Sequence, residues 1–134
     1  MRESRTLNIS IARDWQYVYE AVWRPEDFVR WASGLSQSHL EPEDTGWWQA
    51  QGPDGPIRIR FSGHNAFGVM DHYVDVGNGL EIYVPMRIVA NAEGAEVLFT
   101  LFRQPNMTDE KFSTDAEWVE RDLHALKALL ECSD

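Results

Sequence analysis

With 134 residues, of which 43% are hydrophobic and 12% aromatic, the chain can bury a sizeable core, which excludes a disordered polymer. Its formal net charge of −10 disfavours nucleic acid and anionic lipid surfaces as partners, because phosphate groups would be repelled. The length indicates a single domain over residues 1–134. No run of about 18 apolar residues occurs, so we expect no membrane span.

The N-terminal part predicts one strand followed by two short helices. Residues 5–12 (RTLNISIA) alternate apolar and polar side chains, as a half-buried strand does. Asp14 has the residue type and position of an N-cap for a helix over 15–23. Pro25 suits the first position of a second helix over 25–33.

The remaining chain predicts a meander and then a long helix. Turn signals recur at short intervals between residues 34 and 104, and they separate roughly six segments with strand periodicity. Over 108–131 the apolar residues are spaced by three and four, which indicates one face of an amphipathic helix. Thr114 and Glu117 have the spacing of a capping box, which favours a second helix start there.

These elements predict an α+β fold. The apolar stripe of the long helix must be covered, and the only large surface available is the sheet. We therefore expect a curved antiparallel sheet of about seven strands around the C-terminal helix, with the two short helices after the first strand.

Turn lengths and apolar parity together predict which residues face each other in the sheet. The turn GPDG places Trp48 opposite Ile59, and the turn NAEG places Met86 opposite Phe99. The two longer connections are assigned so that the parity is kept. The inward row across the sheet then reads Trp48, Ile59, His72, Met86 and Phe99.

His72 is the polar member of this inward row. Its neighbour Asp71 faces the other way, so the two cannot form a direct dyad without a bulge, and we expect Asp71 to pair with Arg60 and Arg87 on the outer face. The imidazole needs a partner for a donor and for an acceptor nitrogen. The helix offers three candidate partners, Asp115, Trp118 and Asp122. A satisfied core residue, a ligand contact and a catalyst all remain open for His72.

Four phrases of the chain carry a family resemblance: GVMDHYV, VPMRIVAN, EVLFTLFRQP and WVERDLHALKALLE. They resemble the SRPBCC (START-like) superfamily and, more narrowly, its polyketide cyclase/dehydrase-like branch. The resemblance covers roughly residues 47–131 and implies the helix-grip fold. It also implies a cavity between sheet and long helix, which other members use for hydrophobic small molecules. No established catalytic set of the aromatase/cyclases maps onto these positions.

The leading hypothesis is that the chain binds a small hydrophobic or aromatic molecule, including lipids, in this cavity. The expected ligand contacts are Trp31, Trp48, Ile59, His72, Met86, Phe99, Trp118 and Val119. Two alternatives remain open. One is a cyclase, dehydratase or isomerase with His72 as general acid/base, and the other is an interaction domain whose core is filled by its own side chains.

Other constellations in the sequence indicate no further site. The four histidines form no ligand-spaced pair, and neither a CxxC nor a GxGxxG motif occurs, so we expect no metal and no cofactor. The lone cysteine, Cys132, fits a reducing cytoplasm. An apolar patch is predicted on the outer sheet face, and it indicates a tendency to homodimerise. Its members are Tyr83, Val89, Leu98 and Phe102.

Overall fold

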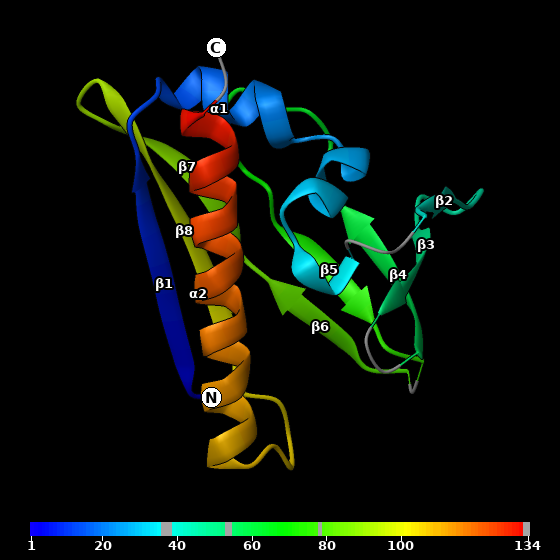
Figure 1. Ribbon diagram of the computed structural model, residues 1–134. Coiled ribbons are helices and arrows are strands. Elements are labelled where there is room, and N and C mark those ends of the chain that lie inside the picture. Colours follow the sequence, from blue (N-terminus) through cyan, green and yellow to red (C-terminus); the bar gives the residue numbers. More distant parts are fainter. Residues whose placement is uncertain (36–38, 53–54, 78, 133–134) are drawn as a thin grey trace.

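The computed structural model describes residues 1–35, 39–52, 55–77 and 79–132, so the centres of two predicted turns, 53–54 and 78, lie outside the described residues. Curved antiparallel strands pack around a long C-terminal helix, which confirms the predicted α+β fold (Figure 1). The elements in chain order are β1 (Ser4–Ile11), α1 (Trp15–Val22), the 3₁₀ segments η1 (Pro25–Arg30) and η2 (Ser33–Leu35), β2 (Glu41–Pro42), β3 (Trp48–Gly52), β4 (Gly55–Phe61), β5 (His72–Asp75), β6 (Glu81–Val84), β7 (Met86–Asn91), β8 (Gly94–Phe102) and α2 (Asp109–Glu131).

The strands form two hydrogen-bonded sheets, with the orders β1-β8-β7 and β2-β3-β4-β5-β6. The sheets meet at Pro85, between β6 and β7, where the missing N–H cannot continue a ladder. The carbonyl of Pro85 accepts a hydrogen bond from the N–H of Thr100 at 3.0 Å. The sequence interpretation treated Val84 and Ile88 as one strand and did not predict β2. The described part of the chain has eight strands where about seven were expected.

Helix α2 covers the three-stranded sheet (Figure 1). The side chain of Thr108 caps it by accepting a hydrogen bond from the N–H of Lys111. The helix is unbroken from residue 109 to residue 131, so the predicted second start at Thr114 is wrong. Its buried residues belong to the predicted stripe and are Phe112, Ala116, Leu123, Leu126 and Leu130.

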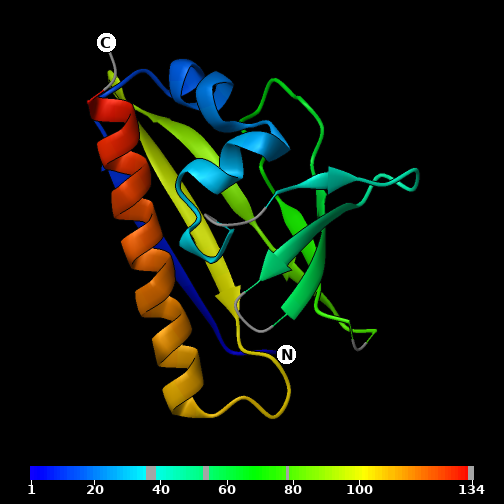
Figure 2. The ribbon, with the colours of Figure 1, turned by 45° about the vertical axis from the view of Figure 1, so that its right-hand side comes forward.

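The segments between β1 and β2 close one end of the fold. Asp14 Oδ2 accepts hydrogen bonds from the N–H groups of Gln16 and Tyr17, which confirms the predicted cap. The second predicted helix is a short 3₁₀ segment instead, and it ends where Trp31 leaves helical backbone angles with φ −135°. Figure 2 shows η1 and η2 between α2 and the strands of the five-stranded sheet.

The strand register confirms the two pairings set by short turns, Trp48 with Ile59 and Met86 with Phe99. His72 lies opposite Phe61 and Val84, not opposite Ile59 and Met86 as predicted. The error is a shift by two residues, and a shift by two preserves the face of every side chain. His72 is therefore inward as expected, and its side chain is buried among apolar neighbours.

The β4–β5 connection fixes where His72 enters the sheet. Asn65 Oδ1 accepts hydrogen bonds from the N–H groups of Phe67 and Val69, and its Nδ2 donates to the carbonyl of Val69. Gly68 adopts φ +70°, and its carbonyl accepts from the N–H of Ile88 at 2.9 Å. A Cβ at Gly68 would lie 2.0 Å from the carbonyl oxygen of Ile88, so only glycine fits this crossing.

Candidate functional site

A cavity of about 200 Å³ lies between the 3₁₀ segments, the inner face of the five-stranded sheet and α2. The described residues that line it are Phe28, Trp31, Ala32, Leu35, Ile57, Ile59, His72, Val74, Phe99, Trp118, Val119 and Asp122. The polar side chains among these residues are His72 and Asp122, and the two tryptophans present mainly their apolar rings.

Six of the eight residues expected to contact a ligand line this cavity, and Trp48 and Met86 do not. The break at Pro85 places Met86 in the three-stranded sheet opposite Phe99, where it is fully buried. Trp48 lies on β3 near the outer strand β2, with which it pairs through Pro42.

The lining also includes six residues that the sequence interpretation did not name as contacts: Phe28, Ala32, Leu35, Ile57, Val74 and Asp122. A signal existed for three of them. Ile57 and Val74 had the inward parity, and Phe28 precedes Trp31 by three residues on the predicted second helix. Asp122 was considered only as a partner of His72.

His72 is the buried polar residue at the centre of this wall, and 8% of it is exposed. Its Nδ1 lies 3.0 Å from the carbonyl oxygen of Met70. A carbonyl can only accept, so Nδ1 carries the proton and Nε2 is the acceptor of the neutral ring. No described group donates a hydrogen bond to Nε2. The carbonyl of Met70 takes the place of the three candidate partners from the helix, and the hydrogen bonds described for Asp115, Trp118 and Asp122 go to other residues.

The charge state of His72 follows from its surroundings. Burial lowers the pKa of the imidazole below its ordinary value, and this outweighs the opposing effects of the Met70 carbonyl and of Asp71. The ring also meets aromatic edges, with centroid distances of 5.3 Å to Phe28 and 6.1 Å to Phe99. An imidazole in such surroundings is neutral near pH 7, so it offers a lone pair at Nε2.

A second polar group joins η2 to α2 beside the cavity. The indole N–H of Trp118 donates to Ser33 Oγ, and Ser33 Oγ donates to Asp122 Oδ1 at 2.6 Å. The backbone N–H of Ser33 donates to the same oxygen at 3.2 Å. Burial raises the pKa of Asp122, and these two hydrogen bonds reduce the shift without reversing it.

Asp71 lies on the opposite face of the sheet, as its parity predicts. It accepts hydrogen bonds from Arg87 Nε at 2.9 Å, Arg87 Nη2 at 2.8 Å and the hydroxyl of Tyr83. Burial alone would raise the pKa of Asp71, but these hydrogen bonds hold it below its ordinary value. The predicted pair with Arg60 is wrong, because that guanidinium stacks on the rings of Trp47 and Tyr73. Asp71 thus links the start of β5 to Tyr83 of β6 and to Arg87 of β7 on the outer face.

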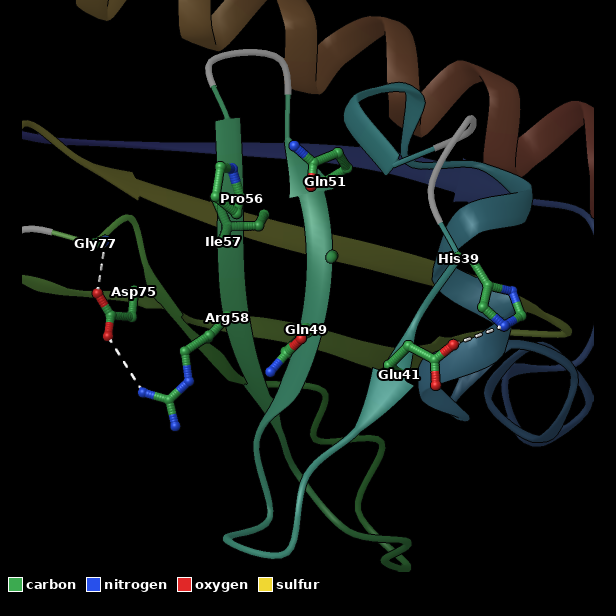
Figure 3. Close-up of a pocket in the computed structure, with 10 residues that line it drawn as sticks. His39, Glu41, Gln49, Gln51, Pro56, Ile57, Arg58, Asp75 and Gly77 are labelled. Atoms are coloured by element: carbon green, nitrogen blue, oxygen red, sulfur yellow. Dashed lines mark hydrogen bonds and ion pairs between the residues drawn. The ribbon is translucent and has the colours of Figure 1, made fainter.

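A larger hollow of about 630 Å³ opens along the edges of β3 and β4. Figure 3 shows its two ion pairs on opposite sides of these strands: His39 with Glu41 at 3.2 Å, and Arg58 with Asp75 at 3.6 Å. Its charged groups thus already pair with one another, and His39 and Glu41 are highly exposed. We therefore place the candidate site in the smaller, apolar cavity around His72.

Metal-ligating side chains are scattered over the described part of the chain. Within residues 1–35, 39–52, 55–77 and 79–132, no three His, Cys, Asp or Glu side chains gather in a way that could hold a metal ion. None of the helices in these same ranges has the length and apolar character needed to span a membrane.

Neither a family model nor a curated protein sequence matches the chain. Solved structures do. Ara h 8.0201 matches with a TM-score of 0.73 at 8% identity over 99% of this chain and 100% of its own. DynU16, a protein of the dynemicin biosynthetic locus, matches with a TM-score of 0.73 at 18% identity over 98% of this chain and 48% of its own. The Aha1 dimer from Colwellia psychrerythraea gives a TM-score of 0.71 at 14% identity, with 97% of each chain covered. Identities this low show the fold alone, and the fold is the predicted helix-grip fold.

Proposed function

We propose that the protein binds a small, largely apolar molecule in the cavity around His72. The observation that carries this proposal is an apolar cavity of about 200 Å³ with a buried imidazole whose Nε2 has no partner among the described residues. An acceptor placed in apolar surroundings costs free energy unless something donates to it, and a ligand can supply the donor. The proposal includes a cytoplasmic setting, which the single thiol of Cys132 supports.

The volume of the cavity limits the size of the ligand. Typical pockets for drug-sized molecules hold about 300–1,000 Å³, and an apolar cavity of about 150 Å³ is large enough for benzene. A cavity of about 200 Å³ therefore suits one or two fused rings. A long-chain lipid would need a wider cavity, so the proposal favours a compact ligand over a lipid.

Filling the cavity tests the proposal directly. Ala32 lines the cavity, and Ala125 lies exposed on α2 outside it, so Ala32→Leu and Ala125→Leu add the same atoms in the two places. We expect Ala32→Leu to lose at least about ten-fold in affinity for naphthalene, since a blocked cavity cannot bury the rings, and Ala125→Leu to keep it. Amide chemical shifts in a naphthalene titration measure both. Equal affinities in the two variants would overturn the proposal.

A cyclase or dehydratase of the polyketide cyclase-like branch is the second candidate. It is favoured by the presence of two titratable side chains in the lining of one cavity, His72 from β5 and Asp122 from α2. In that case, Nε2 of His72 would take a proton from the carbon next to a ketone, and the imidazolium would return this proton to the β-hydroxyl, which would leave as water as the C–O bond breaks and the C=C bond forms. A β-hydroxy ketone probe would then become an enone that absorbs in the ultraviolet. Equal yields from the wild type and from His72→Phe would rule this candidate out.

We also propose a homodimer through the outer sheet face. Val89 is 41% exposed and Tyr83 is 38% exposed, and Tyr83 stacks on Phe102 with centroids 6.2 Å apart. Leu98 lies opposite Arg87 on the same face. Covering these apolar side chains with a second copy of the chain would remove them from water, which favours association. Sedimentation velocity of the purified protein tests whether a dimer forms.

A further inference from the structure

The cavity exposes hydrogen-bond acceptors and no accessible side-chain donor among the described residues that line it. The first acceptor is His72 Nε2, because Nδ1 is committed to the Met70 carbonyl at 3.0 Å. The second is the carboxylate of Asp122. Its Oδ1 receives both hydrogen bonds from Ser33, and no described group donates to Oδ2.

The N–H groups of the lining side chains are not available to a ligand. The indole N–H of Trp118 donates to Ser33 Oγ. The indole nitrogen of Trp31 has no partner among the described residues, but it has essentially no accessible surface, so the cavity meets only the rest of that ring. A ligand that needs to be given a hydrogen bond would therefore find no side-chain donor in this wall.

The charge of the surroundings also disfavours a negatively charged ligand. Burial raises the pKa of Asp122, while two hydrogen bonds from Ser33 to its carboxylate oppose this shift and favour the negative form. The nearby cation, Arg121, is exposed and does not line the cavity. The whole chain carries a net charge of −10. A carboxylate that entered would lose its water and face an imidazole lone pair and another carboxylate, which is unfavourable on both counts.

We propose that the cavity selects a compact aromatic molecule that carries a hydrogen-bond donor, such as a phenolic hydroxyl, and no negative charge. This inference rests on the proposed function, and it names the chemical class of the ligand. The rings would fill the apolar part of the cavity between Trp31, Ile59 and Phe99. The donor would satisfy Nε2 of His72, and the acceptors of the wall would exclude free carboxylic acids.

Three probes of matched shape test this selectivity on the wild-type chain at pH 7: naphthalene, 2-naphthol and 2-naphthoate. Their dissociation constants follow from amide chemical shifts. We expect 2-naphthol to bind about ten-fold more tightly than naphthalene, because it satisfies a buried acceptor. We expect 2-naphthoate to bind at least about ten-fold more weakly than naphthalene, because its charge must be desolvated without a donor.

Two variants assign the selectivity to the named side chains. His72→Phe should remove the preference for 2-naphthol and keep naphthalene binding, and Asp122→Asn should restore part of the affinity for 2-naphthoate. If His72→Phe does not fold, the wild-type series still decides. Equal binding of naphthalene and 2-naphthol, or tightest binding of 2-naphthoate, would overturn the inference and leave the proposed function standing. If none of the three probes binds, the proposed function fails as well.

Discussion

At the scale of single residues, His72 depends on contacts that no local pattern reveals. Alternation within the segment was enough to predict that its side chain faces inward, because parity survives a register shift of two. Its hydrogen-bond partner was not predictable, since it is a backbone carbonyl, that of Met70, which lies just before the first residue of β5. The role of Asp122 depends likewise on Ser33, which lies far from it in sequence.

The buried imidazole predicts a pH dependence of stability. The pKa of His72 is lowered in the folded chain, so the unfolded chain binds more protons below the ordinary value of 6.5. The contribution of His72 to folding stability is therefore fully present above pH 6.5, and it is lost as the pH falls toward the pKa of His72 in the folded chain. The loss can reach about 1.4 kcal/mol per pH unit for one proton. A phenyl ring does not titrate, so the unfolding free energy of His72→Phe should lack this part of its dependence on pH.

Urea unfolding of the wild type and of His72→Phe at pH 7.5, 6.5 and 5.5 measures this difference. The gap between the two unfolding free energies should change steadily in favour of the variant below pH 6.5. His124→Phe is the matched control, because it removes an imidazole from the exposed side of α2. Parallel pH profiles for the wild type and His72→Phe would contradict the prediction.

At the scale of elements, short turns made the register predictable and long connections did not. The turn at NAEG leaves one pairing compatible with parity, and Ala90 does lie opposite Ala95. The β4–β5 connection is set instead by Asn65 and by the close approach of Gly68 to Ile88, which are contacts between segments far apart in the chain. The end of β6 at Pro85 had a local signal, since proline interrupts a ladder.

The crossing at Gly68 predicts a large effect of a single methyl group. Gly68→Ala should destabilise the fold by at least about 2 kcal/mol, because φ +70° is unfavourable for alanine and the Cβ would overlap the Ile88 carbonyl. Gly77 has φ +95°, and among the described residues, its chain neighbours apart, no atom lies within 4 Å of the place that a Cβ would take, so Gly77→Ala carries the backbone cost alone. Thermal unfolding of both variants measures the difference. Equal losses would show that the contact with Ile88 does not matter.

At the scale of the whole molecule, the cavity exists because the strands form two sheets that diverge at Pro85. Helix α2 lies on the three-stranded sheet, while η1 and η2 cover the other sheet (Figure 2). The packing of helix against sheet was predictable, because the apolar stripe of α2 must be buried against another element. The depth of the cavity could not be predicted, because it depends on how far Trp31 and Leu35 of the 3₁₀ region reach toward the sheet.

The outer face of the same molecule yields the last prediction, which concerns assembly. A twofold dimer would bring the patch of Tyr83, Val89, Leu98 and Phe102 against its own copy, so a charge introduced within the patch would be duplicated in the interface. Val89→Lys should therefore weaken the dimer by about ten-fold or more, since an unpaired ammonium would be buried. Val76 is 43% exposed in the β5–β6 connection, so Val76→Lys adds the same charge outside the patch. Sedimentation velocity from about 10 to 200 μM should show a dimer for the wild type and Val76→Lys and a monomer for Val89→Lys, because self-association of weak interfaces appears in this range. A wild type that sediments as a monomer at every concentration, or equal losses in the two lysine variants, would exclude this face as the interface.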